Sequence, residues 1–140
     1  MIFACANTAP APIFESLNTF GLNSVGELAA DIVAIARTIT ADGQMLIDAV
    51  GGSSAFVVAT SNVGNSDVVT ARVRASLADL PVALSLCESD PATAECLSEL
   101  GAETVLPIDV QGVPTFSVFA TATGEIANDP ARNRVIVEFL

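Results

Sequence analysis

Two cysteines close together in the sequence are the residues whose type and spacing most directly suggest chemistry. Cys87 and Cys96 stand on either side of the polar stretch 88–95, whose composition is typical of a turn. A pair of cysteines across a turn predicts a hairpin-closing disulfide in a protein of an oxidising compartment. The alternative is two buried thiols in a cytosolic protein. The third cysteine, Cys5, lies near the N-terminus, and the sequence assigns it no role.

Several residue types that carry most enzymatic chemistry are missing, because the 140 residues include no His, Lys, Tyr or Trp. Without His, neither a Ser-His-Asp nor a Cys-His arrangement can be built. Gly51-Gly52 lacks the Lys and the spacing of a phosphate-binding loop. Three cysteines without any His also argue against a zinc site. Paired carboxylates could in principle hydrolyse glycosides, but the chain has no Trp or Tyr to hold a sugar. We therefore expect no enzymatic activity.

Two turns are rich in the oxygen ligands that calcium prefers. One contains Asn62, Asn65, Ser66 and Asp67, and the other contains the pair Asn128-Asp129. Neither turn has the ligand spacing of an EF-hand loop, and Asn, Asp and Ser are also common turn formers. The sequence therefore predicts no cofactor, with a calcium site at these turns as the alternative.

The chain is strongly acidic, with 16 Asp and Glu residues against five Arg and a net charge of −11. Such a surface repels nucleic-acid phosphates and anionic lipid headgroups, so we expect no nucleic-acid partner. The apolar runs are shorter than the roughly 20 residues needed to span a bilayer, and we expect no membrane insertion. The pairs Arg72/Arg74 and Arg132/Arg134 are interpreted as solvated residues on strand faces rather than as an anion site.

Alternation of apolar and polar residues with a period of two predicts short β-strands through most of the chain. Residues 31–40 suit a strand, or a helix begun by the capping-box spacing of Ser24 and Glu27; we favour the strand. Pro107 lacks a backbone donor and places its strand at a sheet edge or a bulge. The predicted strands are 31–40, 44–50, 55–60, 68–76, 82–87, 104–110, 115–123 and 134–140.

About seven to eight short strands without helix–strand alternation predict an all-β fold, an immunoglobulin-like antiparallel β-sandwich with Greek-key connections. Residues 31–140 form this domain, and the poorly patterned residues 1–30 form an N-terminal extension or linker. Residues 1–5 leave no room for a secretory signal peptide, so we expect the chain to begin within a longer product. The residues predicted to be buried between the sheets include Val73, Leu84, Phe116 and Val137.

Four segments, taken together, resemble an immunoglobulin-like repeat module of large bacterial surface and secreted proteins. That family repeats a Leu-Cys…Pro-Ala-Thr…Cys turn and a later Asp-Pro-Ala-x-Asn-Arg turn. The resemblance covers about residues 31–140 and implies an extracellular or cell-surface location, a bridge between Cys87 and Cys96, and no catalytic residues. The segments are Phe56–Gly64, Leu80–Cys96, Val113–Phe119 and Asp129–Arg134.

We therefore expect a non-catalytic structural or adhesive module of a bacterial cell-surface or secreted protein. Its partners would be neighbouring domains of the same polypeptide or identical subunits. One alternative is a self-assembling subunit of an extracellular filament or virion shell that exchanges strands, either through the open edge beside the Pro107 strand or through residues 1–14. A second alternative is a calcium-dependent binding module. Strand exchange through residues 1–14 is suggested by four apolar residues that have no obvious core partner, namely Ile2, Phe3, Ile13 and Phe14.

Overall fold

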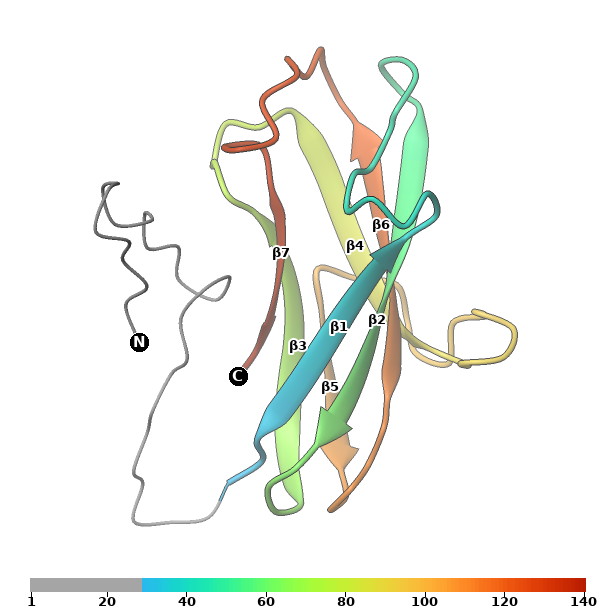
Figure 1. Cartoon of the computed structure of the whole chain (residues 1–140), viewed down its shortest axis with the longest axis vertical. Coiled ribbons are helices and arrows are strands. Elements are labelled where there is room, and N and C mark those ends of the chain that lie inside the picture. Colours follow the sequence, from blue (N-terminus) through green and yellow to red (C-terminus); the bar gives the residue numbers. More distant parts are fainter. Residues whose placement is uncertain (1–28) are drawn as a thin grey trace, which may run out of the picture.

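The computed structural model describes residues 29–140, which form seven strands and no helix (Figure 1). The strands make two antiparallel sheets that enclose one apolar core. The prediction of an all-β antiparallel sandwich is therefore confirmed. The strands are β1 (Ile32–Thr38), β2 (Ser53–Asn62), β3 (Asp67–Ala75), β4 (Val82–Ser89), β5 (Glu103–Ile108), β6 (Thr115–Ala122) and β7 (Val135–Phe139).

The chain crosses between the two sheets at nearly every connection. The first sheet has the order β1-β2-β6-β4 and the second has the order β5-β3-β7. After the antiparallel pair β1 and β2, successive strands lie alternately in the second and the first sheet. The sandwich is therefore held together by non-local pairing rather than by local hairpins.

The strand order differs from that of immunoglobulin domains, so their Greek-key topology is not confirmed. In an immunoglobulin constant domain the fifth strand lies between the second and the fourth, whereas here β6 takes that place. A central strand must donate hydrogen bonds on both sides, and Pro107 in β5 has no N–H to give. β5 accordingly lies at the edge of the second sheet, as the proline predicts, while β6 contains no proline.

The core lies between the two sheets, where alternate residues of each strand meet. Phe116 is fully buried there and Val73 is buried, whereas Leu84 and Val137 are partly buried and pack against the core. Arg72 and Arg74 lie on the opposite, exposed face of β3. The predicted alternation in β3 is therefore confirmed. The buried core residues are Phe56, Val58, Val69, Ala71, Val73, Leu86, Leu106, Ile108, Phe116 and Val118.

The predicted strand over residues 44–50 is wrong, and this leaves seven strands instead of eight. These residues lie in the long connection between β1 and β2. The Asp42 carboxylate accepts hydrogen bonds from the Thr40 hydroxyl (2.6 Å) and the Gln44 N–H (2.9 Å), which turns the chain away from a direct hairpin. Met45 still packs against the core. Residues 44–50 therefore contain apolar side chains, but no neighbouring strand of residues 29–140 pairs with them.

Residues 32–38 form the strand β1, which confirms the prediction of a strand rather than a helix in this region. The apolar side chains of β1 are nevertheless not buried. Val33 and Ile35 share one face of the strand and are 52% and 71% exposed. They lie on the outer face of the sheet, in register with Ser61 and Ala59 of β2. Ile39 follows the end of β1 and is also exposed.

The predicted boundary between extension and domain lies at residues 30 and 31, close to where the description begins. Residues 1–28 are outside the described part of the chain. Cys5, the strand-exchange segment 1–14 and the capping box at Ser24 therefore fall outside it as well.

Candidate functional site

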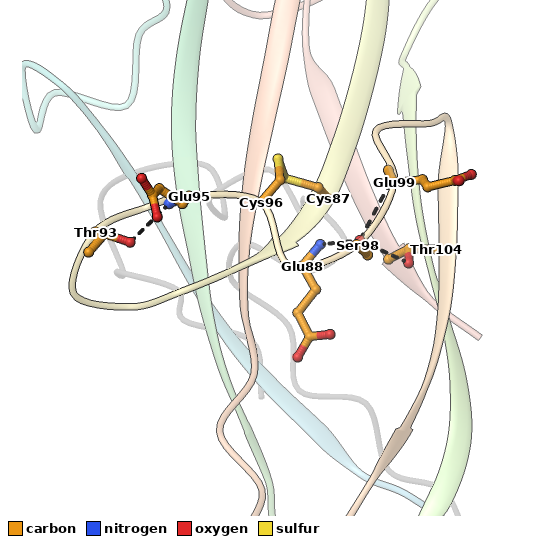
Figure 2. Close-up of a disulfide and its surroundings, with 8 residues drawn as sticks. All are labelled: Cys87, Glu88, Thr93, Glu95, Cys96, Ser98, Glu99 and Thr104. Atoms are coloured by element: carbon orange, nitrogen blue, oxygen red, sulfur yellow. Dashed lines mark hydrogen bonds between the residues drawn. A yellow bond between two sulfur atoms is a disulfide. The ribbon is translucent and has the colours of Figure 1, made fainter.

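The feature of the structure with the clearest chemistry is the disulfide between Cys87 and Cys96 (Figure 2). Cys87 lies on β4, is fully buried, and faces the outer side of the first sheet, in register with Ser117 of β6. Cys96 is exposed and follows the loop after β4. The predicted bridge is therefore present. Beside it, the hydroxyl of Ser89 is the one buried side-chain polar atom without a hydrogen-bond partner among residues 29–140.

The segment after Cys96 runs back along the edge of β4 and covers it. Leu97 N–H donates to Glu88 O (2.8 Å), and Leu86 exchanges two hydrogen bonds with Gly101 (2.7 and 3.1 Å). The Ser98 hydroxyl accepts a hydrogen bond from Glu88 N–H (2.9 Å) and from the Thr104 hydroxyl (3.3 Å), as Figure 2 shows. The disulfide fixes the start of this segment, so the bridge protects an edge that would otherwise be open to another strand.

The turn inside the disulfide loop is built around Asp90. Its carboxylate accepts hydrogen bonds from the N–H groups of Thr93 (3.0 Å) and Ala92 (2.8 Å). These bonds favour the charged form and lower the pKa of Asp90. Ala94 closes the turn with a positive φ of 60° and donates its N–H to Asp90 O. The Asp90 carboxylate therefore stabilises the turn itself.

Reducing the bridge should lower the free energy of unfolding by roughly 2–3 kcal/mol, because the loop it closes is short. Urea unfolding with and without a reductant measures this loss. The Cys5→Ser variant is the control and should unfold like the native chain when both are oxidised. Thiol titration of the unreduced, denatured protein should find one free thiol, Cys5. Three free thiols would contradict the bridge.

Asn62, proposed above as a candidate calcium ligand, is a fully buried structural residue. Its Oδ1 accepts hydrogen bonds from the N–H groups of Asp31 and Gly64 (both 3.0 Å). Its Nδ2 donates to the backbone oxygens of Asn65 (2.7 Å) and Asp109 (3.1 Å). The side chain therefore uses its two donors and accepts two bonds, and it ties the start of β1 to the β2–β3 turn and the β5–β6 connection.

Ser66 and Asp67 of the first oxygen-rich turn and Asp129 of the second also form hydrogen bonds with backbone groups. The Ser66 hydroxyl accepts from Val110 N–H (3.2 Å), and the Asp67 carboxylate accepts from Val68 N–H (2.8 Å). In the second turn, Asp129 O accepts from the N–H groups of Arg132 and Asn133. Within residues 29–140 no group of three or more Cys, Asp or Glu is arranged to hold a metal ion.

The arginines of β3 form ion pairs on the exposed face of the second sheet. Arg72 Nε lies 3.3 Å from Glu103 Oε2, and Arg74 Nη2 lies 2.6 Å from Glu138 Oε1. The hydrogen bond from Arg74 lowers the pKa of Glu138, and the same contact raises the pKa of Arg74. Both arginines therefore have cross-strand partners, which agrees with their interpretation as solvated face residues.

Among the shallow hollows on the surface of residues 29–140, two are lined mainly by apolar side chains. One of about 510 Å³ lies between the end of β3 and the start of β4, with Arg74 beside Leu77, Leu80 and Leu84. The other, of about 310 Å³, lies where the disulfide loop meets the outer face of β2 and β6 and includes Arg37. Each hollow has one guanidinium, with one hydroxyl in the first and two in the second, and neither is lined by a carboxylate.

Comparisons with known proteins add no relative to this picture. No protein-family model, no curated protein and no solved structure matches the sequence. No helix among the described residues is long and apolar enough to cross a membrane.

Proposed function

We propose that the chain is a non-catalytic structural or adhesive module of a bacterial cell-surface or secreted protein. The observation that carries the proposal is the Cys87–Cys96 disulfide, which fixes the segment that covers the β4 edge. Disulfides form and persist in oxidising compartments, and a covalent clamp on a sheet edge suits a domain exposed outside the cell. Its partners would be neighbouring domains of the same polypeptide or identical subunits.

The use of the polar side chains supports a structural role. Asn62, Asp90 and the paired arginines of β3 are each engaged by backbone groups or by a neighbouring strand. An enzyme or ligand-binding site would aim such groups into a cavity, with their hydrogen-bonding capacity left for the ligand. In these four residues that capacity is used for turns and strand pairing.

The experiment that tests the proposal measures mass and thermal stability in solution. We expect a monomer whose melting temperature is the same in millimolar calcium and in chelator, because only a ligand that binds the folded state raises its stability. A large upward shift with calcium would favour the binding module, and the Asn62–Asp67 and Asn128-Asp129 turns would then be its first candidates. Growth into filaments with rising concentration would favour the self-assembling subunit.

A further inference from the structure

We propose that the hollow of about 310 Å³ beside the disulfide loop binds a small carboxylate with an apolar body, in which Arg37 holds the carboxylate and Ser117 bonds a polar atom at the other end. The hollow lies on the outer face of the first sheet, and its volume is at the lower limit of small-molecule sites. The inference deepens the proposed function and rests on it only for the use of the ligand, because binding requires no catalysis.

Strand pairing places the two polar groups at the ends of one row across the sheet. Arg37 of β1 pairs with Val57 of β2, and Val57 pairs with Ser117 of β6. Two strand spacings, about 10 Å between Cα atoms, therefore separate Arg37 from Ser117. In the next row Ala55 pairs with Phe119, and both line the hollow as well. The hollow thus has an apolar floor with a polar group at each end.

The guanidinium of Arg37 is available for an anion. Arg37 is exposed, and its side chain forms neither an ion pair nor a hydrogen bond with another residue of 29–140. Asp42 and Glu95 belong to the segments that border the hollow, but neither lines it. At the outward positions of β1, β2, β4 and β6, Arg37 is the one charged residue, although the chain has a net charge of −11. A guanidinium presents paired donors that match a carboxylate.

The hydroxyl of Ser117 is the second polar group that a ligand can use. Ser117 is only 5% exposed, and its hydroxyl has no hydrogen-bond partner within residues 29–140. The fully enclosed hydroxyl without a partner is that of Ser89, so the Ser117 oxygen is reached from the hollow that it lines. The other hydroxyl of the hollow is already used, because Thr38 donates to Asp42 (3.4 Å) and accepts from Gly43 N–H (3.1 Å). A nearly buried polar group gains most from a new partner.

The surroundings of these two groups favour one class of anion. A single guanidinium matches a single carboxylate, whereas a doubly charged phosphate brings more negative charge and more acceptors than the hollow has donors. The net charge of −11 adds a repulsion that grows with the charge of the ligand. Val57 and Phe119 give an apolar body a surface to cover. We therefore expect an aromatic monocarboxylate with a hydroxyl at its far end, such as para-hydroxyphenylacetate, to bind.

Titration of the full chain with para-hydroxyphenylacetate at constant ionic strength, followed by amide chemical shifts, tests the proposal. The amides of Val57, Ala94 and Phe119 should shift and reach saturation together. The matching amide, para-hydroxyphenylacetamide, has the same shape without the charge and should bind about ten-fold more weakly. Acetate has the charge without the apolar body and should also bind at least about ten-fold more weakly.

Two variants locate the contacts. Arg37→Gln should weaken the binding of para-hydroxyphenylacetate about ten-fold and leave that of the amide unchanged. Arg132→Gln is its control, because it makes the same charge change outside the hollow, and it should bind like the native chain. Ser117→Ala should remove the advantage, about three-fold, of para-hydroxyphenylacetate over phenylacetate. An unchanged amide shift of Val73 in the core reports that each variant is folded.

Three results would overturn the inference: equal binding of the carboxylate and its amide by the native chain, equal losses for Arg37→Gln and Arg132→Gln, or no saturable shift at the hollow. The first of these needs no variant. An advantage of the far hydroxyl that survives Ser117→Ala would contradict the role given to Ser117. Mass and melting with calcium test the module itself and do not involve Arg37, so the two proposals fail separately.

Discussion

Replacing Phe116 by Ala should lower the free energy of unfolding by about 3–5 kcal/mol, because the ring is fully buried and its loss leaves a cavity. Phe116 lies on β6, the central strand that pairs with both β2 and β4. Its ring centroid is 5.5 Å from that of Phe139 on the facing sheet. The side chain therefore joins the two sheets, and urea unfolding of the purified variant measures its contribution.

Arg72→Ala is the matched control for this prediction. Arg72 lies on the exposed face of β3, and its ion pair with Glu103 is largely in solvent. Exposed ion pairs contribute little, so the change should be below about 0.5 kcal/mol. If the Arg72 variant lost more stability than the Phe116 variant, the inner and outer faces would be exchanged, as a one-residue slip of register would do.

Local pattern predicted most of the strands, because alternation depends on neighbouring residues alone. In 68–76 the buried Val69, Ala71 and Val73 alternate with polar residues, and the structure places them as expected. The same pattern failed in 44–50, where the turn at Asp42 and the lack of a partner strand decide the outcome. Alternation shows that a segment can pair but not whether an edge is available to it.

Strand order could not be predicted, because it depends on contacts between distant segments. Pro107 correctly predicted an edge strand, since it lacks one donor. The proline did not predict that β6 lies beside β2. In an immunoglobulin constant domain the fifth strand occupies that position. The loop after β4 shows the same difference between local and distant contacts. The spacing of Cys87 and Cys96 predicted their disulfide, whereas nothing in the sequence predicted the hydrogen bonds between the segment 97–101 and β4.

Asn62 was mistaken for a turn residue, although a signal in the sequence identified its role. The buried residues of β2 are Phe56, Val58 and Thr60, and one further step of two reaches Asn62. A polar residue on an inward position must have hydrogen-bond partners. Continuing the alternation to the end of the strand would therefore have predicted a buried amide bonded to nearby backbone rather than a calcium ligand.

Replacing Asn62 by Ala should lower the free energy of unfolding by about 3 kcal/mol or more. The change removes four hydrogen bonds and leaves the N–H groups of Asp31 and Gly64 without their acceptor. Each buried polar group left unsatisfied costs about 1–3 kcal/mol. No larger side chain at Gly64 can fill the space, because a Cβ there would lie 2.6 Å from Asp31 N. Urea unfolding measures the loss.

Asn133→Ala is the control for Asn62→Ala, because it removes the same side chain from a partly exposed turn. Asn133 Nδ2 makes one hydrogen bond, to Ala127 O (2.7 Å), so the expected loss is about 1 kcal/mol or less.

A second variant, Asn62→Asp, keeps the acceptor but loses the donor and places a carboxylate beside two carbonyl oxygens. Burial and these carbonyls raise the pKa of that carboxyl in the folded state. The Asp variant should therefore become more stable as the pH falls through that raised pKa, since the protonated acid can donate again. Equal losses for Asn62→Ala and Asn133→Ala would mean that the buried amide does not hold the three segments together.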